Sequence, residues 1–450
     1  MNARLASPGG ADRPFRPLRF AAAALLLASA GMAFASPSAA QQPPGPVQTA
    51  PDVQGPVTPE TAPAAIPKPK VVAKPAPPPE IKISQDPRPS FHPESAAMIA
   101  QASRAYAAIA ERGGWVPVPD GPALKPGQEG AAIPFVRARL AAEGEPLADL
   151  AGQRLDADLT AAVRRFQQRY GLPETGIVGP ATVKAMNVPA ADRAKALGYS
   201  AERLASSTFA FGDRYVAVNI PSAAVEAIEF NAVARRYVAV VGDPAHPSPV
   251  VEARIGAINL NPTWTVPVSI VKNEIIPKMR KDPGYLAKSK IRMFGASGQE
   301  IDPARIDWST ERAVNYTLRQ DSGTANALGQ IRIAMPNRHA VYMHDTPSKR
   351  FFGQDFRFLS HGCVRVAGVT DLAAWLAEPY GFGKAAIEAG IAGGERRDIA
   401  LPKPVPVAWV YLTGFVTADG AIHFRNDVYG LDKPDPLDEL VTATIAQPVR

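Results

Sequence analysis

The sequence predicts two folded parts, a small three-helix domain followed by a mainly-β domain. Between about residues 121 and 190, apolar residues recur at spacings of three and four, the period of a helix buried on one side. After about residue 208 they alternate or run together with β-branched residues and are broken by turn residues, which is typical of strands. A chain of 450 residues is long enough for two or three domains.

The first 40 residues are predicted to be an export signal. Basic residues precede an apolar run over 20–35, and the small residues that follow allow cleavage after Ala35 or Ala40. The run is short for a bilayer span, which favours cleavage, and an uncleaved anchor is the alternative. The formal net charge of +7 favours acidic polymers or surfaces as partners and does not specify a fold.

Residues 41–90 are predicted to be a proline-rich, disordered linker. Proline removes amide donors and fixes φ, so we expect a semi-extended chain with polyproline II character instead of a packed core. A spacer that holds the folded part away from the export site and a tail without a role both fit this composition. Residues 91–120 are expected to form an N-terminal helical segment, because small and apolar residues follow helical spacing there.

The small domain is predicted over residues 121–190. Its central helix is marked by an apolar face and by Gly171 after its last turn, and a third helix begins at Pro180. The pattern resembles the three-helix type of peptidoglycan-binding domain. The positions that carry this resemblance are Ala162, Val163, Phe166, Gln167, Gly171, Leu172, Thr175, Gly176, Val178, Gly179, Thr182 and Met186. Most of them are core positions, so a helical packing module that binds nothing is the alternative.

The strand-rich domain is predicted over residues 208–400. A lysine-rich segment with a helical pattern, at about 270–325, is expected to be inserted between its strands. Residues 401–450 are predicted to form a C-terminal β-hairpin extension and tail, with the turn at Ala418 to Gly420.

Cys363 is the only cysteine of the chain. Secreted domains use cysteines in pairs, so a single thiol in an exported protein is either inert and buried or retained for its reactivity. Cysteine attacks as the thiolate, which a nearby imidazole generates near neutral pH. His361 is two residues away, but Gly362 indicates a turn between them. His344 ends an apolar strand, and the turn-rich loop after it can return the chain to the thiol. Backbone amides at the glycine could then stabilise an oxyanion.

His344, fifteen intervening residues and the run Ser360 to Arg365 resemble the signature of L,D-transpeptidases, a histidine followed at that distance by Ser or Thr and His-Gly-Cys. Many members of the family have Asn where this chain has Arg365, and the arginine form is similar to the large, lid-bearing Gram-negative branch. Further segments that resemble that branch are Asn261 to Ile270, Asn326 to Asn337 and Phe424 to Gly430. The resemblance covers about Leu124 to Asp435.

The resemblance implies a role for each motif residue. Cys363 is expected to be the nucleophile and His344 the general base and later the proton donor. The amides of His361, Gly362 and Cys363 are expected to form an oxyanion hole. Substrate-binding residues are expected to be Arg365, Tyr342 and Ser360, although a structural ion pair is an open alternative for Arg365. Whether Asp345 orients the imidazole is left open.

The resemblance also implies a β-sandwich catalytic domain with short helices and an inserted helical lid. The implied reaction is acyl transfer: Cys363 takes a peptidoglycan tetrapeptide stem with release of D-Ala and passes it to an amine, which gives a 3→3 crosslink. No cofactor or metal is expected. The other histidines show no metal-ligand spacing; they are His92, His246, His339 and His423. The expected protein is a monomer in the periplasm at the cell wall, with peptidoglycan and not nucleic acid as partner, and with membrane attachment only through an uncleaved signal.

Other readings of the same residues remain. An L,D-carboxypeptidase or endopeptidase would use the same thioester with water, and a third enzyme would attach a protein lysine to the wall. A sortase-like enzyme also has His before Cys before Arg but lacks the Ser-His-Gly-Cys cluster. A non-catalytic wall-binding protein would keep the motif without using it, and Cys363→Ala would then change nothing.

Overall fold

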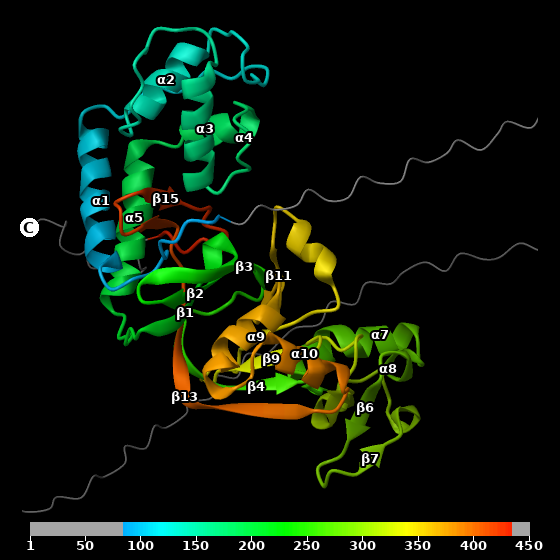
Figure 1. The fold of residues 1–450 in the computed structure, drawn as a ribbon. Coiled ribbons are helices and arrows are strands. Elements are labelled where there is room, and N and C mark those ends of the chain that lie inside the picture. Colours follow the sequence, from blue (N-terminus) through cyan, green and yellow to red (C-terminus); the bar gives the residue numbers. More distant parts are fainter. Residues whose placement is uncertain (1–83, 434–450) are drawn as a thin grey trace, which may run out of the picture. The chain divides into compact units, whose positions relative to one another are not determined.

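The computed structural model describes residues 84–433, shown as a ribbon in Figure 1. The predicted export signal, most of the predicted linker and the tail over 434–450 lie outside the described residues. Between residues 84 and 433, no helix combines the length and the apolar character that crossing a bilayer requires.

The helices of the small domain lie where helical spacing predicts them. They are α2 (Ile133–Ala141), α3 (Ala157–Arg169) and α4 (Pro180–Met186). The Asp156 side chain caps α3 by accepting from the amide of Leu159. Gly171, with φ of +66°, takes the left-handed conformation that ends this helix. The buried faces of α2 and α3 meet in one apolar core, which explains why three short helices hold together.

Two longer helices flank this domain in the sequence and pack against each other. They are α1 (Ser95–Glu111), in the predicted N-terminal segment, and α5 (Ala190–Ala205) (Figure 1). The chain before α1 also contacts the folded body. Arg236 donates to the backbone oxygens of Ser84 and Asp86, and Ser90 donates to the Glu226 carboxylate. Residues 84–90, which composition assigned to the linker, therefore pack on the sheet.

The second domain is built on one nine-stranded sheet, as the prediction of a mainly-β domain requires. The order of its strands is β11-β3-β12-β10-β9-β4-β13-β1-β2, and β2 also pairs with β3, so that the sheet closes on itself. The strands are β1 (Arg214–Asn219), β2 (Ala224–Glu229), β3 (Ala232–Gly242), β4 (Val251–Leu260), β9 (Ile331–Ala334), β10 (Met343–His344), β11 (Phe358–Ser360), β12 (Val364–Val366) and β13 (Arg397–Val410).

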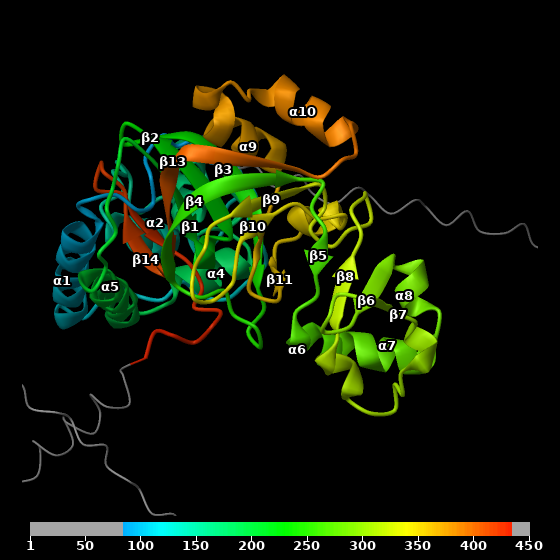
Figure 2. The same ribbon diagram turned by 90° about the horizontal axis from the view of Figure 1, so that it is seen from below.

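The sheet buries an apolar core on each face. One core is formed with α9 (Val369–Ala377) and α10 (Lys384–Ala392), which Figure 2 shows beside β13. The other core joins the sheet to the helices and to the hairpin of β14 (Gly414–Val416) and β15 (Ile422–Phe424). The Phe424 ring lies 5.4 Å from Tyr106 of α1 and 5.2 Å from Tyr170 after α3. This hairpin therefore packs between the small domain and the sheet.

The last strand of the sheet differs from its predicted boundary. β13 continues to Val410, beyond residue 400, and pairs with both β1 and β4. The sequence Pro402-Lys403-Pro404 is typical of a loop, but in the structure it lies within β13, where the register shifts between Ala400 and Val405. Prolines are tolerated at such an irregularity because it interrupts the regular ladder of amide donors.

The inserted segment is a small α+β unit, which corrects the expectation of a purely helical lid. It contains α6 (Val268–Ile270), a π-helical turn (Val271–Ile275), α7 (Ile276–Lys281) and α8 (Tyr285–Lys288). It also contains a four-stranded sheet of β5 (Trp264–Thr265), β8 (Thr317–Gln320), β6 (Ile291–Phe294) and β7 (Glu300–Ile301). A separate apolar core holds the insert together. We call this insert, from Trp264 to Gln320, the lid.

Candidate active site

The pairing of two short strands brings the motif together. β10 and β12 are parallel neighbours, with Met343 opposite Val364 and His344 opposite Arg365. Met343 and Val364 are fully buried in the core. Since successive side chains on a strand point to opposite faces, their neighbours point away from that core. The residues placed on this outer face are Tyr342, His344, Cys363 and Arg365.

A pocket of about 540 Å³ lies over this face. Its walls come from the sheet and from the lid. Every predicted site residue lines it except Gly362, which is buried in the turn behind Cys363. The predicted residues in the wall are Tyr342, His344, Ser360, His361, Cys363 and Arg365, and the lid adds Trp264, Glu274, Lys278 and Tyr285 among others.

His344 is arranged as a neutral base. Its Nδ1 lies against the backbone oxygen of Asp345, which can only accept, so Nδ1 carries the hydrogen and Nε2 keeps a lone pair. Burial lowers the pKa of His344 to about 4, and the neighbouring charge of Arg365 acts in the same direction. The imidazole is therefore uncharged near neutral pH and is able to accept a proton.

The Asp345 side chain does not orient the imidazole. Its carboxylate accepts from the amide of Gln330 at 3.1 Å and forms an ion pair with Lys349. Its backbone oxygen is the group that meets the ring. The residue after His344 therefore positions the imidazole through its main chain.

Cys363 is half-buried, and its surroundings act on the pKa of its thiol in opposite directions. Burial raises the pKa of the Cys363 thiol, while the amide and the hydroxyl of Tyr342 favour the thiolate, as do the charges of Arg365 and Arg332. Tyr342 lies beside Cys363 in the strand register, and burial raises the pKa of Tyr342. A protonated thiol near a neutral base suits attack that is coupled to proton transfer.

A tight turn precedes the thiol. Gly362 has φ of +98°, a conformation that residues with a side chain rarely adopt. The Ser360 hydroxyl donates to the backbone oxygen of Cys363, and Ser248 donates to that of Gly362 at 2.8 Å. The Ser360 hydroxyl is thus already used to close the turn. Within the described chain, no residue accepts a hydrogen bond from the amide of Gly362 or Cys363.

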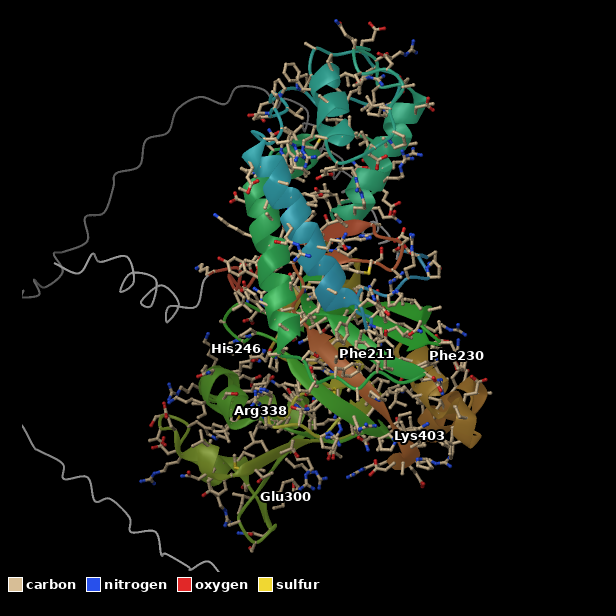
Figure 3. All side chains as sticks on the ribbon, turned by 90° about the vertical axis from the view of Figure 1, so that its left-hand side faces the viewer. Phe211, Phe230, His246, Glu300, Arg338 and Lys403 are labelled. Atoms are coloured by element: carbon tan, nitrogen blue, oxygen red, sulfur yellow. The ribbon has the colours of Figure 1, made fainter. Side chains whose placement is uncertain are left out.

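His361 faces the lid. Its Nε2 lies 3.2 Å from Oε1 of Glu274, and its ring lies 4.4 Å from that of His246 in the loop after β3, labelled in Figure 3. Glu274 also accepts from Nζ of Lys278 at 2.8 Å. The His361 imidazole therefore makes a contact between the lid and the catalytic sheet, and its partner there is a carboxylate.

Arg365 is a cation in the wall of the pocket. Across the described ranges, its guanidinium has no hydrogen-bond or ion-pair partner, and it lies 6.0 Å from the Phe351 ring. Burial lowers the pKa of Arg365. In the described structure, Arg365 therefore does not form the structural ion pair that the sequence left open as an alternative.

Several residues at the site were not among the predicted site residues, Glu274, Trp264 and Arg332 among them. Glu274 and Trp264 reach the pocket because the lid folds over it. Arg332 lies on β9 with its guanidinium 5.5 Å from the Tyr342 ring. A charged residue between the buried Ile331 and Ile333 was the one available signal, since a strand that alternates in this way turns the arginine away from the core.

Comparison with known proteins agrees with this geometry. Residues 213–397 match the YkuD family model, described as "L,D-transpeptidase catalytic domain", and residues 129–186 match a model described as "Putative peptidoglycan binding domain". A curated protein of Haemophilus influenzae named "Putative L,D-transpeptidase" is 30% identical over 224 residues, which are 50% of this chain and 45% of that protein. The chain thus matches less than half the length of this relative.

Solved structures give weaker similarities. An L,D-transpeptidase from Mycobacterium smegmatis is 15% identical, with 43% of this chain and 58% of that chain covered and a TM-score of 0.22. An L,D-transpeptidase from Stackebrandtia nassauensis is 13% identical, with 65% and 96% covered and a TM-score of 0.24. TM-scores this low carry no argument, so the assignment rests on the family models. By those models, this chain is similar to the YkuD L,D-transpeptidase catalytic domain over residues 213–397 and to a peptidoglycan-binding domain over residues 129–186.

Proposed function

We propose that this protein is an exported L,D-transpeptidase that crosslinks peptidoglycan through a thioester on Cys363. The observation that carries the proposal is the shared face of β10 and β12. There, a half-buried thiol, a neutral imidazole and an unpartnered guanidinium line one pocket. These groups supply a nucleophile, a base and a site for a carboxylate.

In the first step the Cys363 sulfur attacks the carbonyl carbon of the third residue of a tetrapeptide stem. Nε2 of His344 takes the thiol proton as the carbon–sulfur bond forms. The amides of Gly362 and Cys363, with that of His361, stabilise the charge on the carbonyl oxygen. The carbon–nitrogen bond then breaks, and His344 returns the proton to the nitrogen of the departing D-Ala.

In the second step a primary amine of a neighbouring stem attacks the thioester carbon. His344 accepts the proton that the amine loses, and the sulfur leaves and is protonated again. One amide bond is exchanged for another, so no external energy source is required. The guanidinium of Arg365 suits a stem carboxylate, because no protein group neutralises it in the described structure.

The lid has a physical role in this scheme. The thioester must be protected from water until the amine arrives, and the lid forms one wall of the pocket. The contact of Glu274 with His361 joins this wall to the sheet, and Trp264 of the lid lines the same pocket as Tyr342. The peptidoglycan-binding domain would raise the local concentration of the polymer. We propose a periplasmic monomer at the cell wall.

Product analysis tests this function. The full mature chain is incubated with muropeptides that contain tetrapeptide stems, and the products are separated and weighed. We expect dimers joined through the third residues of two stems, with free D-Ala. Shortened monomers without dimers would instead indicate an L,D-carboxypeptidase, and loss of existing dimers an endopeptidase. Transfer to a protein lysine, with no stem dimers, would indicate attachment of a protein to the wall.

A further inference from the structure

A third strand contributes a charged side chain that the proposed mechanism does not use. β9 is antiparallel to β10, and their register places Arg332 opposite His344. Ile331 and Ile333, on either side of Arg332, are buried in the core. Arg332 therefore lies on the same face of the sheet as the reactive groups, one strand further from Cys363.

Side-chain hydrogen bonds hold the guanidinium of Arg332 on the side of β4, away from β10. Its Nε donates to Oδ1 of Asn259 at 2.8 Å, and Nδ2 of Asn259 donates to Oδ1 of Asp398 at 2.7 Å. The register places these residues directly opposite one another across β9, β4 and β13. A row of paired polar positions thus crosses the sheet and ends at the Tyr342 ring, whose centre is 5.5 Å from the guanidinium carbon.

Tyr342 connects Arg332 to the nucleophile. A cation near an aromatic ring is attracted to its electron-rich face, which restricts the ring. Tyr342 lies beside Cys363, because the register that pairs Met343 with Val364 places the preceding residues next to each other, and both side chains line the pocket. We propose that Arg332 is a positioning residue that fixes the Tyr342 side chain beside the Cys363 sulfur and adds a positive charge to its surroundings. This inference rests on Cys363 being the nucleophile of the proposed function.

Arg332 differs from the other charges around the sulfur. The titratable and charged groups that line the pocket around the sulfur come from β10, β12, the turn before β12 and the lid; they are Tyr342, His344, His361, Arg365, Glu274, Lys278, Tyr285 and Lys288. Arg365 lines the pocket, so a bound carboxylate neutralises it. Arg332 does not line the pocket. Its charge therefore continues to favour the thiolate after the donor has bound.

The experiment uses the single thiol of the chain as its own probe. The full mature protein is alkylated with iodoacetamide over a range of pH, and intact mass gives the rate at Cys363. We expect Arg332→Met to move the midpoint upward by about half a pH unit or more, because a nearby positive charge is lost. Arg332→Lys should return the midpoint towards that of the wild type. Arg254→Met removes an exposed arginine from β4 and is the matched control, with an unchanged midpoint.

A midpoint for Arg332→Met equal to that of the wild type overturns the inference, and so does a lysine variant no better than the methionine variant. Arg332→Gln replaces Arg332→Met if circular dichroism shows that the methionine variant is unfolded. Incubation with a tetrapeptide donor separates this inference from the proposed function. If Arg332→Met shows the alkylation shift but the wild type never forms an acyl adduct, only the proposed function is contradicted. Acylation with no shift contradicts only the role of Arg332.

Discussion

Replacing Gly362 by alanine tests the turn beside the thiol. Gly362 has φ of +98°, and an added Cβ would lie 3.5 Å from the backbone oxygen of Pro247, an ordinary contact. The cost of the substitution is therefore conformational and not steric. An L-residue in a left-handed conformation costs about 1–2 kcal/mol. At about 2–4 °C per kcal/mol for a domain of about 150–250 residues, the melting temperature of the catalytic domain should fall by about 2–8 °C.

The effect of Gly362→Ala on acylation should exceed its effect on stability. The backbone can relieve the strain by rotating the peptide groups of the turn, which redirects the amides of Gly362 and Cys363. Loss of one oxyanion donor typically slows acyl transfer about 100- to 1,000-fold. The assay follows the acyl adduct by intact mass, at a temperature at which circular dichroism shows the variant to be folded.

Gly368→Ala is the matched control. Gly368 also has a left-handed conformation, with φ of +69°, and its added Cβ would lie 3.6 Å from Tyr237. It precedes α9, outside the pocket. This variant should lose a similar amount of stability and acylate like the wild type. If Gly362→Ala and Gly368→Ala acylate at the same rate, the oxyanion role of the turn is refuted.

Three further predictions follow from burial and charge. The rate of acylation should fall on the acid side with a midpoint near pH 4, because the pKa of His344 is lowered to about 4; a midpoint near 6.5 would contradict a neutral, buried base. The unfolded His344 binds its proton near pH 6.5, so the contribution of this group to stability is lost as pH falls from 6.5 to 4, which urea unfolding at several pH values measures. His423→Phe should raise the melting temperature, and more at pH 5 than at pH 7. Burial lowers the pKa of His423 to about 3, and neither ring nitrogen has a partner in the described chain. The ring stacks on Phe415, so phenylalanine keeps the apolar contact. A lower melting temperature of His423→Phe would contradict this prediction. Glu274→Gln should shorten the lifetime of the acyl adduct about two- to fivefold, because a partly exposed ion pair contributes at most about 1 kcal/mol; a longer lifetime would count against the role of the lid.

The parts of the site that could be predicted are those formed by residues that are consecutive in the sequence. The run from Ser360 to Arg365 contains its own turn, and the spacing to His344 is a property of the chain. Arg332 and Glu274 are brought to the site only by strand register and lid packing. Neither register nor packing is visible in local periodicity, since the pairing partner of a two-residue strand such as β10 is chosen by the whole sheet.

The fold shows the same division between local and distant information. The helices of the small domain were predictable because each has a local signal: apolar spacing in α2, the Asp156 cap and Gly171 for α3, and Pro180 at the start of α4. The lid sheet was not, because strands of two to four residues are too short to show alternation. The same limit applies to β13, where three closely spaced prolines, Pro402, Pro404 and Pro406, hide a strand that continues through an irregular register.

The most direct test of the central claim is the mass of the intact protein after incubation with a defined tetrapeptide donor. The wild type should gain the mass of the donor stem less its terminal D-Ala, and the gain should map to Cys363. Cys363→Ala should remain unmodified under the same conditions. An unmodified wild type, or an equal adduct on both proteins, would contradict the claim that this sulfur carries the peptidoglycan fragment.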